Sequence, residues 1–469
     1  MKKYISALLV LLLASVLVAC AADPDASEEA VTDESAVEAT EAVEEATEAM
    51  DDADADADME AEAESEADED DMEATDEADA MADDEAMAET PLPIGLWEQC
   101  ETPDLSGTIT FGAPLGLTGP ISVYGVPEQQ GVDLAIAEIN ESGYLGDAQI
   151  EMIYEDTEGD AQQAINAMTK LIEEDNVVAV FGPSLSSEAF AADPIAQEAG
   201  IPTMGVTTSA IGIPQIGDYI FRGNLPEQVL IPIMVEEVQT LYNIQDVAVL
   251  YGDDDDFTVT GYNVFIEALD GSGINITNEA TFARGDVDFN PQLTTLVTGD
   301  NVPDALVVSA LAAEGIQIIV QARALGYEGL ILGGNGFNSP DIASEAGEDA
   351  TNLIVGASWN IGGGNDLSQR FVSLFEEEYG RQPDQFSVQA YTVMWIFATA
   401  IRCEGSAESD AIRDGLFNIQ DFASPLGDFS FDGEGEPFHE PVVQIFDAGD
   451  FVPLTEDLVD PALVVEEAE

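Results

Sequence analysis

Thr108-Ile109-Thr110-Phe111-Gly112 predicts a short buried strand, and residues 130–140 after it place apolar side chains at helical spacing. The same alternation of strand and helix continues along the chain and restarts after residue 246. Further strands are predicted at residues 148–154, 177–182, 202–206, 247–251, 305–308 and 330–332. Further helices are predicted at residues 160–174, 188–199, 261–269 and 316–325. Short apolar strands separated by amphipathic helices are typical of parallel sheets covered on both faces. We therefore expect an α/β protein with two Rossmann-like, doubly wound lobes.

Negative charge dominates the chain, which has 96 acidic residues, ten lysines and arginines, and a formal net charge of −86. The body after residue 98 keeps 63 acidic and eight basic residues over about 370 positions, a length that suggests two domains. No basic patch can form in such a body. The composition therefore excludes nucleic acid as a partner.

Residues 1–20 have the features of an export signal. Lys2 and Lys3 precede an apolar run over residues 4–19, which is too short to span a bilayer comfortably. The run ends in Leu17-Val18-Ala19-Cys20, which resembles a bacterial lipobox. That resemblance implies cleavage before Cys20, a lipid on its thiol, and an extracytoplasmic, membrane-anchored protein. The alternative is an ordinary secretory signal with an incidental cysteine.

The segment over residues 21–98 contains 33 acidic residues and no lysine or arginine. It has too little apolar surface to offset chain entropy, and its like charges repel one another. We expect a disordered, extended tether. Partial helix is the alternative because Ala and Glu favour helices, although dense like charge opposes it.

Cys100 and Cys403 are the only cysteines after Cys20. In an exported protein the two can form a disulfide, and the alternative is a pair of free buried thiols. The spacing along the chain does not decide between them.

The loops after the predicted strands supply hydroxyl and backbone N–H groups near helix starts. Ligands in such sheets bind beyond the carboxyl ends of the strands, and helix N-termini favour anions. These loops predict a carboxylate site that needs no lysine or arginine. Their hydroxyl-bearing candidates are Ser186, Ser187, Thr207, Thr208 and Ser209. The alternative is that Ser186 and Ser209 are simple helix N-caps.

Several motifs resemble the branched-chain amino-acid-binding proteins of ABC transporters, over residues from about 106 to about 450. The motifs are Phe111-Gly112-Ala113-Pro114-Leu115, Leu117-Thr118-Gly119-Pro120, Ala135-Ile136-Ala137-Glu138-Ile139-Asn140, Val178-Ala179-Val180-Phe181-Gly182-Pro183 and Val247-Ala248-Val249-Leu250-Tyr251. The resemblance implies a type I periplasmic-binding-protein fold, with two lobes joined by three hinge crossings that close on a ligand. We expect lobe 1 to contain residues 106–226 and 358–435, and lobe 2 residues 227–357 and 436–469.

The same resemblance implies roles for individual side chains. Hydroxyls of Ser186 and Ser209 and the backbone of Thr207 match the positions that hold a ligand carboxylate. Tyr124 and Phe257 match cleft aromatics, and Leu311 lies roughly where some members have a tyrosine.

One position departs from the leucine-binding pattern. Those members place an acid in a Gly-x-acid-Gly loop to pair with the ligand ammonium, whereas this loop is Gly333-Gly334-Asn335-Gly336. A neutral Asn335 cannot form that ion pair. The ligand class therefore stays open among amino acids, amides and small organic acids.

Motifs for catalysis, metal or cofactor binding are absent from the sequence. His439 is the only histidine and is expected at the surface, and no Gly-x-Ser-x-Gly or phosphate-loop motif occurs. Residues 253–256 are expected to be a solvated acidic turn rather than a calcium site. We predict a transport receptor that delivers a solute to ABC permease subunits, with no enzyme activity and no cofactor. An extracellular sensor of the same fold is the alternative, and a hydrolase is third.

Overall fold

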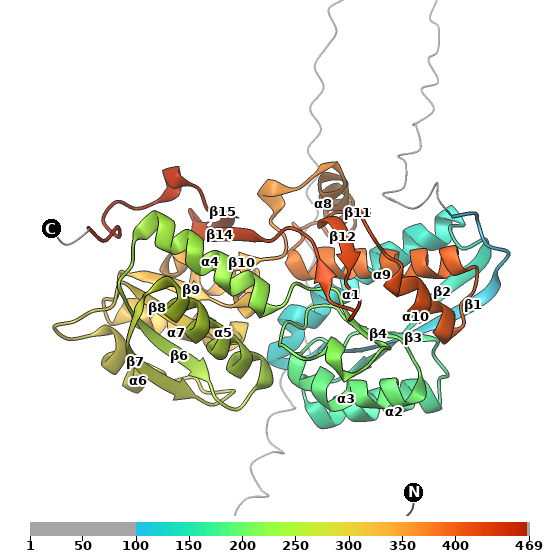
Figure 1. The fold of residues 1–469 in the computed structure, drawn as a ribbon, viewed down its shortest axis with the longest axis horizontal. Coiled ribbons are helices and arrows are strands. Elements are labelled where there is room, and N and C mark those ends of the chain that lie inside the picture. Colours follow the sequence, from blue (N-terminus) through green and yellow to red (C-terminus); the bar gives the residue numbers. More distant parts are fainter. Residues whose placement is uncertain (1–99, 467–469) are drawn as a thin grey trace, which may run out of the picture. The chain divides into compact units, whose positions relative to one another are not determined.

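The computed structural model describes residues 100–466, in which two mainly parallel sheets form the centres of two lobes (Figure 1). The predicted signal peptide, Cys20 and the acidic tether lie outside the described residues. Within residues 100–466, no helix has the length and apolarity needed to cross a membrane.

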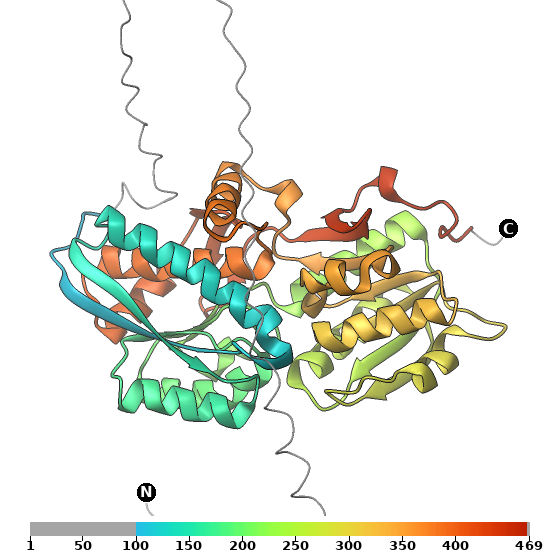
Figure 2. The ribbon, with the colours of Figure 1, turned by 180° about the vertical axis from the view of Figure 1, so that it is seen from behind.

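Lobe 1 contains a five-stranded parallel sheet in the order β2-β1-β3-β4-β5. Its elements in chain order are β1 (Ser106–Leu115), α1 (Ser122–Ser142), β2 (Asp147–Asp156), α2 (Ala161–Glu173), β3 (Ala179–Phe181), α3 (Ser186–Ala199), β4 (Thr203–Gly205) and β5 (Ile220–Arg222). Three later helices, α8 (Asp366–Tyr379), α9 (Gln385–Glu404) and α10 (Ser409–Phe417), also pack on this lobe. Helices α1 and α9 lie together on one face of the sheet, and α2 and α3 cover the other (Figure 2).

Lobe 2 contains a seven-stranded sheet in the order β15-β14-β10-β9-β8-β6-β7, in which only β14 runs opposite to the other strands and pairs antiparallel with β10 and β15. Its elements are α4 (Glu227–Tyr242), β6 (Asp246–Gly252), α5 (Asp256–Ser272), β7 (Asn275–Phe282), α6 (Asn290–Val297), β8 (Ala305–Ser309), α7 (Ala312–Ala324), β9 (Leu330–Gly333), β10 (Leu353–Ala357), β14 (Val442–Asp447) and β15 (Asp450–Pro453).

Strand β6 shows how the sheet of lobe 2 is buried on both faces. Ala248 and Leu250 pack in one apolar cluster with α6 and α7, whereas Val247 and Val249 pack in another with α4 and α5. Successive side chains of a strand point to opposite faces, so a continuous apolar run requires helices on both sides. The doubly wound fold class predicted from the sequence is confirmed.

The chain crosses between the lobes three times. The crossings follow β5, β10 and β13 (Pro437–Phe438), the last strand of a small antiparallel sheet with β11 (Phe422–Ser424) and β12 (Gly427–Phe431). The residue bounds that we assign to each lobe remain our proposal. The crossings after β5 and β10 bring the chain directly past the ends of the strands that carry the candidate site.

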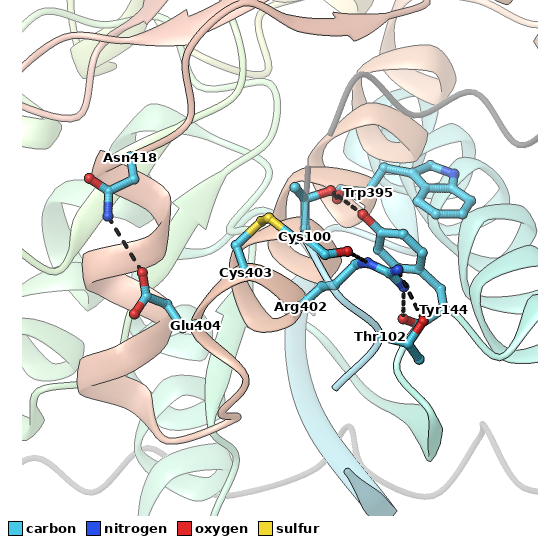
Figure 3. The surroundings of a disulfide bond; sticks show 9 residues. Cys100, Thr102, Tyr144, Trp395, Arg402, Cys403, Glu404 and Asn418 are labelled. Carbon is cyan, nitrogen blue, oxygen red and sulfur yellow. Dashed lines mark hydrogen bonds between the residues drawn. A yellow bond between two sulfur atoms is a disulfide. The ribbon is translucent and has the colours of Figure 1, made fainter. Parts of the chain in front are cut away.

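Cys100 and Cys403 form a disulfide with a Cα–Cα distance of 5.1 Å, which ties the segment before β1 to the end of α9 (Figure 3). Arg402 reinforces this junction by donating hydrogen bonds to the carbonyl oxygens of Cys100, at 3.0 Å, and Tyr144, at 2.6 Å. Its guanidinium also lies 4.5 Å from the centre of the Tyr144 ring, within cation–π range. Arg402, one of the few cations of the chain, thus stabilises the junction between the segment before β1 and the end of α9.

Helix α1 begins eight residues before the predicted start at residue 130. Gly125 allows its first turn to approach the loop after β1, because an added Cβ would lie only 2.2 Å from the carbonyl oxygen of Gly116. Pro127, the sixth residue of α1, has no backbone N–H to donate within the helix. Glycine and proline are poor helix formers, so the sequence pattern did not predict this turn. The turn places Tyr124 between the lobes.

Candidate functional site

A cavity with about 300 Å³ of empty space lies between the lobes, at the carboxyl ends of the central strands. Lobe 1 and lobe 2 both contribute to its wall. The lining residues are Tyr124, Ser184, Leu185, Ser186, Thr207, Ser209, Phe257, Leu311, Asn335, Gly336 and Phe386.

Ser186 and Ser209 form the hydroxyl-bearing wall of lobe 1. The Oγ of Ser186 accepts hydrogen bonds from the backbone N–H groups of Ser209, at 3.3 Å, and Ala210, at 3.2 Å. The hydroxyl of Ser209 is buried and has no hydrogen-bond partner among the described residues. Because buried polar groups are rarely left unpaired, the Ser209 hydroxyl is available to a ligand in the cavity.

Tyr124 bridges the two lobes at the cavity. Its hydroxyl accepts a hydrogen bond from the N–H of Ala312 at 2.8 Å and donates to the carbonyl oxygen of Gly336 at 3.2 Å. Gly336 permits this approach, since an added Cβ would lie 2.6 Å from the oxygen of Ala310 and 3.3 Å from the Tyr124 hydroxyl. The structure therefore shows the lobes in direct contact around the cavity.

Asn335 is fixed by one hydrogen bond from lobe 1 and one from lobe 2. Its Oδ1 accepts from the Nε2 of Gln385, on the first residue of α9, at 2.9 Å. The same oxygen accepts from the Nδ2 of Asn338 at 3.2 Å. The amide that replaces the family's acid thus has its acceptor oxygen already occupied.

Glu227 lies directly behind Asn335. Its Oε1 accepts a hydrogen bond from the backbone N–H of Asn335 at 2.9 Å, while its Oε2 is buried without a partner among the described residues. Burial raises the pKa of Glu227 to about 7, and the hydrogen bond from Asn335 opposes that rise. Sequence reasoning missed Glu227 because nothing marks it as different from other acids at the start of a helix.

Glu128 lies behind Ser184 and Thr207 on the lobe 1 side. Its two carboxyl oxygens contact the hydroxyls of Ser184, at 2.5 Å, and Thr207, at 2.6 Å. Burial raises its pKa to about 7, although the bonds to the two hydroxyls act in the opposite direction. Sequence reasoning missed Glu128 and Ser184, and no signal in the sequence distinguishes this glutamate from the exposed acids of α1.

The predicted ligand residues divide into two groups. Tyr124, Ser186, Thr207, Ser209, Phe257 and Asn335 line the cavity. Ser187 and Thr208 are not among the lining residues. Leu311, assigned only loosely from the sequence, also lines the cavity.

The N-cap interpretation of Ser186 and Ser209 is wrong. Leu185 precedes the first turn of α3, and Glu188 accepts the N–H of Leu185 at 2.9 Å. Ser186 instead joins two loops. The backbone N–H of Ser209, expected to be free for a ligand, is donated to Ser186.

The expectation of a surface His439 is wrong, whereas the expected solvated turn over residues 253–256 is confirmed except at Asp255. His439 is 3% exposed, not a surface residue, and stacks on Phe429 with ring centres 5.8 Å apart. Asp255 is buried at the start of α5, where its carboxylate accepts the N–H of Phe257 at 3.0 Å, so the acidic turn is only partly solvated. Among residues 100–466, no cluster of three or more His, Cys, Asp or Glu side chains is arranged to hold a metal.

The profile of the periplasmic binding protein family matches residues 108–446. A leucine-, isoleucine-, valine-, threonine- and alanine-binding protein of Pseudomonas aeruginosa is 23% identical over 346 residues, which cover 70% of this chain and 87% of that protein. LivJ, a branched-chain amino acid transporter substrate-binding protein of Streptococcus pneumoniae solved with isoleucine, is similar with a TM-score of 0.70 and 28% identity, covering 74% of this chain and 98% of LivJ. An ABC transporter solute-binding protein of R. palustris solved with benzoate has a TM-score of 0.69 and 20% identity, covering 74% of this chain and 96% of that one.

Buried carboxyl groups give the protein an unusual dependence of stability on pH. Burial raises the pKa of Glu128, Glu188 and Glu227 from 4.5 to about 7 and that of Asp193 well above its usual value. Each group holds a proton in the folded chain that it loses in the unfolded chain. Their stabilising contribution is complete below about pH 4.5 and is lost as the pH rises through 7.

We therefore expect the free energy of unfolding to fall by at least about 3 kcal/mol between pH 5 and pH 8, the contribution of one carboxyl shifted this far. Urea denaturation across that range measures it. Asp193→Asn should flatten the curve, because neither oxygen of the fully buried Asp193 has a partner among the described residues. Stability that rises with pH in both proteins would contradict this assignment.

Proposed function

The chain belongs to the periplasmic binding protein family, and on this premise we propose that it captures a small carboxylate-bearing solute between its lobes and delivers it to an ABC permease. Membership of the family implies an extracytoplasmic location. The relatives above are named as binding proteins, which supports a receptor rather than an enzyme. The buried, unpartnered hydroxyl of Ser209 is the observation that carries the proposal.

The lobe 1 wall suits a carboxylate. Ser209 offers a hydroxyl without a partner, and the first N–H groups of α3 have no carbonyl partner within their own helix. The N-terminus of α3 also carries partial positive charge toward the cavity. These groups can bind an anionic oxygen without a cation, since no lysine or arginine lines the cavity.

Ser209→Ala tests the carboxylate site. Loss of one hydrogen bond to a charged group should weaken binding by about 1.5–3 kcal/mol, or roughly 10- to 150-fold in Kd. The ligand is first found by thermal-shift screening of amino acids, amides and organic acids, and Kd is then measured by calorimetry. Ser186→Ala is a poorer test because it would also leave two buried backbone N–H groups without their acceptor.

Thr208→Val is the matched control for Ser209→Ala. Thr208 also has a buried hydroxyl without a partner among the described residues, but it does not line the cavity. It should keep the wild-type affinity. Equal affinities for the wild type and both variants would exclude the carboxylate site at Ser209.

The end of the cavity at Asn335 is compatible with two ligand classes, amino acids with an ammonium group and carboxylates without one. Isoleucine in LivJ carries an ammonium group, whereas the benzoate of the R. palustris protein does not. Asn335 is neutral, but Glu227 behind it has an unpaired carboxyl oxygen. We propose that Glu227 loses its proton when a ligand ammonium binds and then supplies the negative charge, in the place of the missing acid.

Glu227→Gln distinguishes the two classes. An amino acid should bind at least about tenfold more weakly to the variant, because its ammonium loses a charged partner. A carboxylate without an ammonium should bind the variant about as well as the wild type, since the amide is neutral, as the protonated acid is. Calorimetry with isoleucine and with benzoate gives both values. Unchanged affinity for an amino acid would refute the role of Glu227.

We further propose that Cys20 carries the lipid that anchors the receptor, and that residues 21–98 act as its tether. A lipobox-like sequence at the end of a short apolar run supports the anchor. In the expressing cell, Cys20→Ala should move the protein from the membrane fraction to the soluble fraction and remove the lipid mass detected by mass spectrometry. Equal membrane retention of both proteins, without a lipid on Cys20, would contradict the anchor.

A further inference from the structure

The carboxyl group of Glu128 lies in a chain of hydrogen bonds whose protons can be counted. The Oγ1 of Thr207 lies 2.6 Å from Oε1 of Glu128 and 2.8 Å from the backbone carbonyl oxygen of Ser184. A hydroxyl has one proton to donate, yet both neighbours are acceptors when Glu128 is ionised. An ionised Glu128 therefore leaves one of these two short contacts without a proton.

A neutral Glu128 satisfies every contact in the chain. Its own O–H donates to Oγ1 of Thr207, and Thr207 then donates to the carbonyl oxygen of Ser184. The hydroxyl of Ser184 donates to the other oxygen of Glu128 and accepts the N–H of Gly116 at 3.2 Å. Each hydroxyl then donates one bond and accepts one, as expected for a buried network.

Ser184 and Thr207 both line the cavity, so the charge of Glu128 controls what they present to a ligand. When Glu128 is ionised, both hydroxyls turn their protons toward it and a buried negative charge lies behind them. When Glu128 is neutral, the Thr207 proton is donated to the carbonyl oxygen of Ser184 and no negative charge lies behind the two hydroxyls. The two states favour opposite ligand charges.

We propose that Glu128 is a positioning residue that acts through Ser184 and Thr207. Binding of a carboxylate ligand is then coupled to protonation of Glu128, because a carboxylate enters only when Glu128 is a neutral acid. The inference rests on the proposed function, because it concerns the same cavity. The inference adds that the charge of Glu128 determines which ligand charge the cavity accepts. The receptor loads anionic solutes more tightly at acidic than at alkaline pH.

The charged groups around Glu128 support a neutral acid. Asp384, at the start of α9, is negative and lies close enough to raise the pKa of Glu128. Its partner Arg381 lies 3.3 Å from the carboxylate of Asp384 and is bonded there rather than to Glu128. Glu188 on α3 is a further buried acid, and Tyr124 lies one turn earlier on α1. Burial, the largest cause, raises the pKa of Glu128 to about 7, so the linkage falls in an accessible range.

The test is the Kd of isoleucine and of benzoate, measured by calorimetry from about pH 6 to about pH 8.5. For the wild type, the Kd of benzoate should be constant below about pH 7 and then rise by about tenfold per pH unit, the slope for one linked proton. The slope for isoleucine should be shallower, because the proposed ionisation of Glu227 favours its ammonium over the same range. Glu128→Gln should bind with little dependence on pH, because its amide can donate to Thr207 and accept from Ser184 as the neutral acid does. Benzoate does not titrate in this range, which removes the ligand as a source of the slope.

Asp193→Asn is the matched control, since Asp193 is an equally buried acid that neither lines the cavity nor has a hydrogen bond to it among the described residues. It should keep the wild-type slope. A wild-type Kd that is flat with pH, or a slope that survives in Glu128→Gln, would overturn the inference and leave the binding function standing.

Failure of both probes to bind at any pH would count against the proposed function for these ligands, and an infrared measurement then decides the inference separately. The difference spectrum between the wild type and Glu128→Gln should show a carboxylic-acid C=O band at about pH 6 and a carboxylate band in its place at about pH 8.5. Absence of that difference would show that Glu128 is ionised and would refute the proposal.

Discussion

Scarcity of positive charge is the constraint on which the rest of the structure depends. The body after residue 98 has eight basic and 63 acidic side chains, and most of the basic ones form structural contacts. Arg222 is buried against Glu436, and Arg323 donates to backbone carbonyl oxygens. Arg402 fastens the disulfide junction. No cation lines the cavity, so an anionic ligand must be held by hydroxyls, N–H groups and the end of a helix.

The same constraint determines the state of the buried acids. Moving an ionised carboxylate out of water is costly unless a cation accompanies it, and this chain has few to offer. The alternative is to bury the acid with its proton, as the contacts of Glu128 and the raised pKa values of Glu188 and Glu227 indicate. A neutral acid is both a donor and an acceptor, which lets it organise hydroxyls such as those of Ser184 and Thr207. A buried acid such as Glu128 can therefore orient the groups of the site without placing a negative charge beside them.

The fold was predictable from the sequence because strand and helix periods alternate clearly, as the apolar run of β6 shows. The position of the site followed from topology, since residues after parallel strands meet at one edge. That rule correctly brought Tyr124, Ser209 and Asn335 to the cavity. It could not separate Ser186 from Ser187 or Thr207 from Thr208, because neighbouring side chains of a loop point in directions that only the packed backbone determines.

The acids behind the cavity were not predictable for a different reason. Glu128 and Glu227 have the same local sequence character as the exposed acids around them, and their burial depends on contacts with residues far along the chain. His439 shows the same effect, because its burial comes from packing on Phe429 rather than from its neighbours in sequence. Sequence pattern identifies which elements meet. It does not determine which polar side chain is enclosed where they meet.

The hinge and the cavity share one set of hydrogen bonds, which argues that occupancy and lobe position are coupled. Asn224, in the crossing after β5, donates to the carbonyl oxygen of Thr207 at 3.0 Å and accepts from Ser358, in the crossing after β10, at 2.7 Å. The N–H of Ser358 in turn donates to Gln385 at 2.7 Å, and Gln385 holds Asn335. A chain of amides and hydroxyls thus runs from Thr207 in lobe 1, through two of the three crossings, to Asn335 in lobe 2. If the proposed site binds its ligand through Thr207, the ligand contacts a network that also spans two of the crossings, which is how capture and closure can be linked.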